Sequence, residues 1–314
     1  PIVMKTNISL ILILCLLLGA CKNGNASSQN KSETSQDTIK AIKMPAIPQM
    51  MTAPEQRADF LAKHYWDNVN FADTNYIHHP EVTEQAWADY CDLLNHVPLE
   101  TAQQAMRNVI DRTNVDKKVF TYITDLADKY LYDPNSPMRN EEFYIPVLEA
   151  MIASPVLNET EKIRPQARLK LAQKNRIGTK ALNFTYTLAS GAQGSLYQLK
   201  AEYLLLFINN PGCQACTETI EGLKNAPIIN QLLQEKKLVL LSIYPDEELD
   251  EWKKHLSEFP NEWINGYDKK FTIKEEQVYD LKAIPTLYLL DKDKTVLLKD
   301  ATAPAIEAYL MQHQ

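Results

Sequence analysis

The sequence has no His-x-x-x-His pair and no second Cys-x-x-Cys pair beside the one at residues 213–216. A zinc site needs further ligands, and haem attachment needs a histidine at position 217, which is threonine. No Gly-x-Gly-x-x-Gly loop is present, which argues against flavin or nicotinamide binding. The formal net charge is −7 and no basic cluster stands out, so nucleic acid is not expected as a partner. The sequence therefore predicts no metal and no cofactor.

A peroxide-reducing cysteine is also disfavoured by what is missing. A peroxiredoxin would place Thr or Ser three residues before its reactive cysteine and would use an arginine to hold the peroxide. Here that position is Asn210, and no arginine occurs after Arg176. No internal repeat is visible, and the hydrophobic fraction of 45% is that of an ordinary globular protein.

The motif that is present lies where a redox dithiol would be expected. An apolar run at 203–208 predicts a strand, residues 209–212 predict a turn, and a helix is predicted from Cys213 onward. The free N–H groups and positive dipole at a helix N-terminus favour a thiolate on Cys213, and a thiolate is the species that attacks disulfides. Cys216 lies one helical turn later and is predicted to resolve the resulting mixed disulfide.

A second segment, Ile284-Pro285-Thr286, precedes an apolar, β-branched and aromatic run that predicts a strand. Taken alone, Pro285 suits either a plain strand entry or a cis turn. Beside a Cys-x-x-Cys motif, the segment closely resembles the Ile-Pro-Thr loop that faces the two cysteines of thioredoxins. This resemblance implies that Pro285 is cis and keeps metals off the cysteines. It also implies that Ile284 pairs its backbone with the substrate chain.

The resemblance extends over residues 178–314, which look like the TlpA/ResA type of membrane-tethered thiol–disulfide oxidoreductase. The matching parts are an opening hairpin at 178–199, a strand at 238–244, a helix at 246–256, a closing hairpin around 291–294 and a last helix at 303–311. This order implies a thioredoxin-like α/β domain at 177–314, with a mixed sheet covered by helices on both faces.

Three positions depart from the family pattern. Gly212 stands where many relatives have tryptophan, which suggests a more open site. Phe207 stands where thioredoxin has a buried acid, and Thr219 stands where the TlpA/ResA type has an acid, with Glu218 one position early. Glu218 is thus a possible acid for proton transfer at Cys216. It is equally a first-turn carboxylate, like Glu221, that complements the helix dipole.

The first residues predict export and lipidation. Lys5 precedes an apolar run at 8–18 that is too short to span a bilayer, and Leu18-Gly19-Ala20-Cys21 resembles a bacterial lipobox. We expect residues 1–21 to be a signal peptide with translation starting at Met4, and Cys21 to be lipidated; an ordinary signal peptide cut after Ala20 is the alternative. Residues 22–44 are predicted to be a flexible tether, and Lys22, in place of aspartate, favours the outer membrane.

Residues 45–176 predict an all-α domain. Thr52 and Glu55 indicate a capping box, and apolar residues recur at helical spacing. These stripes are Trp87, Tyr90, Cys91 and Leu94; Leu99, Met106, Val109 and Ile110; Phe120, Ile123 and Tyr130; and Tyr144, Val147, Leu148 and Met151. Cys91 is expected to be buried as a small apolar residue. Together the two parts give an α+β two-domain chain that resembles lipoproteins of the Bacteroidetes, whose helical domain has no known function.

The combined patterns predict a membrane-anchored thiol–disulfide oxidoreductase of the cell envelope, facing the periplasm. Because Gln214-Ala215 includes no histidine to stabilise the reduced form, a reductase or isomerase is favoured over an oxidase. The expected partners are disulfide-containing envelope proteins, a membrane thiol reductant donor and the membrane itself through the lipid anchor. The alternative is a non-catalytic binding lipoprotein that uses the thioredoxin-like module as a scaffold or redox switch.

Overall fold

The computed structural model describes residues 41–313, and the helical and sheet-forming parts described below belong to the same unit of the chain. The predicted signal peptide at 1–21, the lipidation site Cys21 and most of the predicted tether at 22–44 lie outside the described residues. Within the described part, no helix is both long enough and apolar enough to cross a bilayer.

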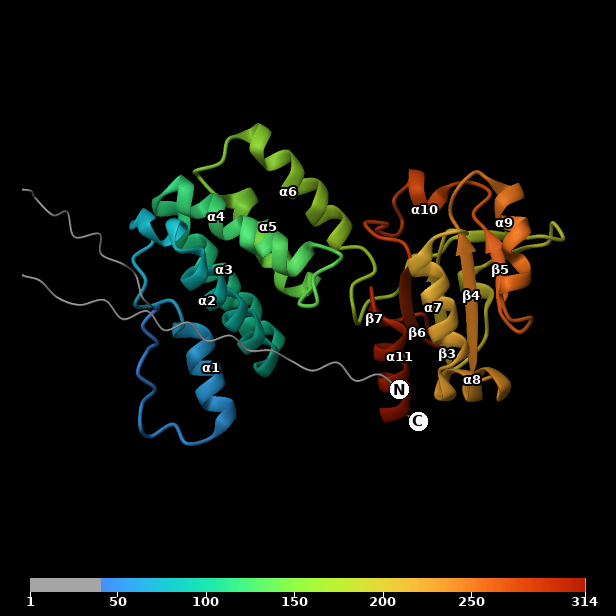
Figure 1. The fold of residues 1–314 in the computed structure, drawn as a ribbon, viewed down its shortest axis with the longest axis horizontal. Coiled ribbons are helices and arrows are strands. Elements are labelled where there is room, and N and C mark those ends of the chain that lie inside the picture. The colour runs from blue at the N-terminus through green and yellow to red at the C-terminus, as the bar shows by residue number, and fades with distance from the viewer. Residues whose placement is uncertain (1–40, 314) are drawn as a thin grey trace, which may run out of the picture. The chain divides into compact units, whose positions relative to one another are not determined.

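The first part of the described chain is helical, as expected (Figure 1). Its α-helices are α1 (Pro54–His64), α2 (Pro80–Leu93), α3 (Leu99–Arg112), α4 (Lys117–Ala127), α5 (Glu141–Ala153) and α6 (Glu159–Ala172). A π-helical turn, Asp128–Tyr132, follows α4. The side chains of Asp116, Asn140 and Asn158 accept backbone N–H groups at the starts of α4, α5 and α6. These donors would otherwise have no partner, so the three caps fix where the helices begin.

The predicted apolar stripes form the core of this helical portion. Trp87, Tyr90, Met106 and Phe120 are fully buried. Cys91 is 2% exposed in the same cluster, which confirms its predicted burial, and this burial raises the pKa of its thiol. These side chains pack against one another from α2, α3 and α4 and so hold the helices together.

Two local predictions in this portion are wrong. The capping box of Thr52 and Glu55 does not form, because α1 begins at Pro54 with Ala53 as its N-cap and without a side-chain cap. Proline lacks an N–H and its fixed φ suits the first helical position, so the helix begins one residue later than the box requires. Leu99 is 48% exposed, because it is the first residue of α3 and precedes the buried stripe.

The second part of the chain forms one mixed sheet with the strand order β2-β1-β5-β4-β3-β6-β7. The strands are β1 (Thr185–Leu188), β2 (Gln193–Ser195), β3 (Tyr203–Ile208), β4 (Leu238–Tyr244), β5 (Ile264–Tyr267), β6 (Thr286–Asp291) and β7 (Val296–Lys299). The central strands β3, β4 and β5 are parallel, and β6 runs antiparallel to β3. This arrangement confirms the predicted mixed sheet.

Helices cover both faces of the sheet. They are α7 (Gln214–Lys224), α8 (Pro227–Gln234), α9 (Leu249–His255), α10 (Thr272–Glu275) and α11 (Ala303–Gln312). Leu205 and Phe207 of β3 point into a cluster with α7, α8 and α11, whereas Leu204 and Leu206 point into a second cluster that includes Ile273 of α10. The alternation follows from the two-residue side-chain period of a strand, and it buries β3 on both sides.

The sequence prediction missed some elements and misplaced others. Helices α6 and α8 were not expected individually, and β5 was not expected at all, because it contains Asn265 and Gly266 and lacks a continuous apolar run. The predicted helix at 246–256 begins only at Leu249. The strands and helices that frame the Cys-x-x-Cys motif lie where they were predicted.

Candidate active site

The two cysteines of the motif lie at the junction of β3 and α7. Cys213 is the N-cap residue of α7, and its Sγ accepts a hydrogen bond from the backbone N–H of Cys216 at 3.4 Å. Both side chains are free thiols. A sulfur in this position receives the N–H groups and the positive dipole of the helix start, which stabilise negative charge.

Gly212 allows the sharp turn before the first cysteine. Its φ is +73°, a left-handed conformation that favours glycine, and a side chain there would meet nothing within 4 Å. Gly212 is exposed, so the approach to Cys213 is open at this position, as the missing tryptophan suggested.

The loop before β6 comes to the same place through strand pairing. β3 and β6 pair so that Ile208 lies opposite Thr286. Ile284 and Pro285 are thereby placed beside the turn that follows β3, and the Cys213 thiol donates to the Ile284 carbonyl at 3.8 Å. The Ile284–Pro285 peptide bond is cis. Thr286 fixes the turn, since its hydroxyl donates to the Ala283 carbonyl at 2.6 Å.

The two thiols have different surroundings. Cys213 is half-buried at the surface, whereas Cys216 is 2% exposed on the inner side of α7. Burial raises the pKa of the Cys216 thiol to about 12, although the backbone N–H of Asn210 acts in the opposite direction. The accessible sulfur is therefore Cys213, and Cys216 is a protonated thiol at neutral pH.

The acidic residues on α7 lie on its outer side. Glu218 is exposed and accepts a hydrogen bond from the Gln214 amide at 2.9 Å. Glu221 is exposed and pairs with Lys224 at 2.9 Å. Neither carboxylate shares the buried environment of Cys216, so the role of Glu218 as an acid stays a prediction.

A cleft of about 480 Å³ begins at the cis-proline loop. Its walls come from segments far apart in the sequence: residues 215–222 of α7, the loop 283–287, residues 300–304, and the segment 134–139 of the helical portion. The last wall was not predicted from the sequence. No local pattern marks residues 134–139, and only the tertiary structure brings them to the cleft.

A buried cluster of charges lies behind this loop. Lys282 pairs with Glu141 at 3.0 Å, with Asp280 at 3.1 Å and with Asp300 at 3.3 Å. Lys299 pairs with the other oxygen of Glu141. Burial alone would lower the pKa of Lys282, but the three carboxylates outweigh it and raise that pKa. The cluster thus joins the first turn of α5 to residues just before the cis-proline loop and to residues at the end of β7.

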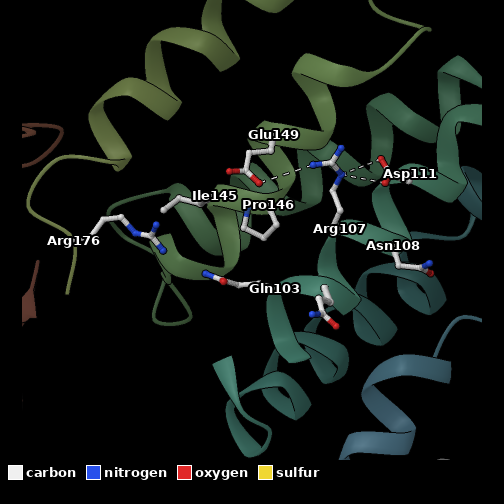
Figure 2. Close-up of a pocket in the computed structure, with 9 residues that line it drawn as sticks. Gln103, Arg107, Asn108, Asp111, Ile145, Pro146, Glu149 and Arg176 are labelled. Carbon is white, nitrogen blue, oxygen red and sulfur yellow. Dashed lines mark hydrogen bonds and ion pairs between the residues drawn. The ribbon is translucent and has the colours of Figure 1, made fainter. Parts of the chain in front are cut away.

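A separate hollow of about 440 Å³ lies between α3 and α5, and Figure 2 draws the side chains that line it. Arg107 lies across it, 3.0 Å from Asp111 and 3.9 Å from Glu149. The residues that line this hollow include neither cysteine nor histidine. Within residues 41–313, His, Cys, Asp and Glu side chains form no group suited to a metal ion. Among the described residues, Cys213 and Cys216 are thus a pair of neighbouring thiols outside this hollow.

Comparison with known proteins relates both parts of the chain to existing families. The model of a domain of unknown function, DUF5106, matches residues 20–175, and a model described as thioredoxin-like matches residues 201–296. No curated protein matches the chain significantly.

Solved structures are similar to most of the chain or to its second part alone. A thioredoxin-like protein from Bacteroides caccae is 84% identical, with a TM-score of 0.86, over 88% of this chain and 100% of its own. The C-terminal domain of an uncharacterized protein from Bacteroides fragilis is 69% identical over 44% of this chain and 98% of its own, with a TM-score of 0.43. The thioredoxin domain of a thiol-disulfide oxidoreductase from Bacteroides vulgatus is 19% identical over 44% of this chain and 97% of its own, with a TM-score of 0.40.

Proposed function

This chain belongs to a family of Bacteroides thioredoxin-like proteins in which a helical domain of unknown function precedes the thioredoxin-like part, and we propose that it is a thiol–disulfide oxidoreductase. The observation that carries the proposal is the position of Cys213. Its sulfur caps α7, lies 3.4 Å from the Cys216 backbone nitrogen and faces the Ile284 carbonyl at 3.8 Å. An accessible thiol at a helix start, with a second thiol one turn later, is the arrangement that dithiol exchange requires.

The reaction proceeds in two exchanges. The Cys213 thiolate attacks one sulfur of a substrate disulfide, forms a mixed disulfide and releases the other substrate sulfur as a thiolate, which takes a proton from water. The Cys216 thiol then loses its proton and attacks the Cys213 sulfur, which releases the second substrate sulfur. The substrate gains two electrons and two protons, and the protein is left with a Cys213–Cys216 disulfide that an external thiol reductant must reduce.

The loop residues hold the substrate. Ile284 offers its backbone beside Cys213, Pro285 shapes the turn, and Thr286 fixes the start of β6 through its bond to Ala283. Gln214 and Ala215 between the cysteines include no histidine, so nothing in the dipeptide stabilises the reduced form strongly. We therefore place the protein among reductases or isomerases. Reduced chain mixed with a disulfide-bonded test protein should generate free substrate thiols; failure to generate them would contradict the proposal.

The second exchange should depend steeply on pH. Burial, the largest cause of the raised pKa of Cys216, persists in the mixed disulfide, whereas the contribution of the Cys213 sulfur is lost there, so the thiolate fraction of Cys216 should still increase, by up to about tenfold for each unit, from pH 6 to pH 9. We expect the decay rate of the mixed disulfide to rise in proportion, as measured by acid quenching and mass spectrometry in single-turnover reactions. A rate that levels off near pH 7 would mean that a nearby group lowers the pKa of Cys216. In that case Glu218→Gln tests the candidate acid directly, with Glu221→Gln as the matched control.

We further propose that the chain is anchored to a membrane of the cell envelope through lipid on Cys21, facing the periplasm at the outer membrane. Leu18-Gly19-Ala20-Cys21 and the following Lys22 support this placement. Its substrates would be disulfide-containing envelope proteins, and a membrane thiol reductant would supply the electrons. Cells given a labelled fatty acid should label the wild-type chain but not Cys21→Ala; equal labelling of both would exclude this anchor.

A further inference from the structure

The cleft beside the cysteines is completed by the helical portion. Pro134, Asn135 and Arg139 line it together with Ile284 and Pro285 of the cis-proline loop. A substrate chain held against Ile284 would therefore extend along a wall that a minimal thioredoxin-like domain does not possess. Much of the cleft is lined by small or apolar side chains, which leave room for an extended polypeptide segment.

Arg139 is the cation of this wall. It is half-buried, and its Nη2 donates to the Asp300 carbonyl at 2.5 Å. Among residues 41–313, no carboxylate lies within 4 Å of its guanidinium, whereas the Asp300 carboxylate is already paired with Lys282. The thioredoxin-like part has no arginine of its own, because Arg176 is the last one in the sequence. The remaining N–H groups of Arg139 are thus available to an anionic partner in the cleft.

The wall is held in place by the buried charges behind it. Glu141, two residues after Arg139, binds both Lys282 and Lys299, and its side chain is 12% exposed. Lys282 lies two residues before Ile284, so the same contacts position the cis-proline loop. Arg139 and the loop are therefore held in a fixed relation before any substrate binds, which lowers the entropic cost of recognition.

We propose that this cleft, with Arg139 as its specificity determinant, binds an extended substrate segment that carries an acidic side chain beside its reactive cysteine. The proposal rests on the oxidoreductase function proposed above. It gives the helical portion a role in substrate selection. Glu218 also lines the cleft and has no cation within 4 Å among the described residues. Because this carboxylate would attract a lysine, a substrate segment that carries lysine is the right comparison for one that carries an acidic side chain.

The test uses disulfide-linked peptide dimers that differ only in having Glu or Lys two residues before or after the cysteine. The full chain, pre-reduced, is mixed with each peptide and quenched by alkylation, and oxidation of Cys213 and Cys216 is followed by mass spectrometry. Hydroxyethyl disulfide, a small neutral substrate, reports the intrinsic reactivity of the dithiol. Arg107→Gln is the matched control, because it removes the same charge from the hollow of Figure 2.

We expect the wild type to react with the Glu peptide on the order of fivefold faster than with the Lys peptide, in at least one of the two positions. Arg139→Gln should abolish that preference, Arg139→Lys should keep part of it, and Arg107→Gln should leave it unchanged. Arg107→Gln should react with hydroxyethyl disulfide as the wild type does, and a measurable reaction of each Arg139 variant with this small disulfide shows that its fold and dithiol are intact. No preference in the wild type, or a preference that survives Arg139→Gln, would overturn this inference. A wild type inert towards every disulfide would instead overturn the proposed function.

Discussion

Replacing Cys213 with serine should lower the rate of protein-disulfide reduction by at least about a thousandfold, because a hydroxyl at this position cannot form the mixed disulfide. Cys216→Ser should behave differently. It keeps the accessible sulfur at the start of α7 and so should complete the first exchange and then stop. We expect it to accumulate a covalent complex with its substrate, detectable as a band shift on non-reducing gels that disappears on reduction.

Cys91→Ser is the matched control for these two variants. Cys91 is buried in the helical core and does not contact the cleft, so its replacement should leave the exchange rate unchanged. The Cys213 variant also separates the two candidate functions. If the chain is an enzyme, this change abolishes turnover. If it is a non-catalytic binding lipoprotein, the variant binds its partner as well as the wild type does. Wild-type reduction activity that persists in Cys213→Ser would exclude the proposed chemistry.

Glu141→Gln should lower the free energy of unfolding by about 3–5 kcal/mol, because it removes one partner from a buried ionic cluster. The side chains of Lys282 and Lys299 are 9% and 6% exposed, and both bind this carboxylate. Without it, Lys282 keeps the carboxylates of Asp280 and Asp300, whereas Lys299 keeps only the backbone carbonyls of Ala172 and Lys174. Urea unfolding of the variant and the wild type, monitored by tryptophan fluorescence, measures the difference.

Glu149→Gln provides the control on the same helix. Its carboxylate lies 3.9 Å from Arg107 and is 43% exposed, so the change should cost less than about 1 kcal/mol. The double variant Glu141→Gln with Lys282→Met should lose less stability than the sum of the single changes, because the two side chains contact each other. A loss below about 1 kcal/mol for Glu141→Gln would show that the cluster does not secure the helical portion to the loop.

The sequence allowed the reactive centre to be predicted because its signals are local. A Cys-x-x-Cys pair after an apolar run specifies a strand, a turn and a helix start, and these occur as β3, residues 209–212 and α7. The Ile284-Pro285-Thr286 segment is recognisable in the same way. The resemblance to thioredoxins implied that this segment faces the two cysteines, and the pairing of β3 with β6 brings it into contact with Cys213.

The wall of the cleft and the charge cluster could not be predicted, because they depend on side chains that meet only in the folded chain. Arg139 binds the carbonyl of a residue 161 positions away, and Glu141 binds Lys282 across 141 positions. Single charged residues in a sequence are ordinarily interpreted as exposed, so nothing distinguished these from their neighbours. Strand β5 escaped prediction for a related reason, since its pairing with β4 and β1 compensates for a weak local pattern.

The most direct test of the account is the reduction potential of the Cys213–Cys216 pair. The full chain is equilibrated with dithiothreitol or glutathione buffers of known potential, and the disulfide-linked fraction of the peptide containing both cysteines is measured by alkylation and mass spectrometry. We predict a reversible two-electron transition between about −270 and −180 mV, the range of thioredoxin, glutaredoxins and protein disulfide isomerase. The proposed reductase or isomerase function would be contradicted if the pair formed no reversible disulfide, or if its potential were about −120 mV, as in a strong oxidant.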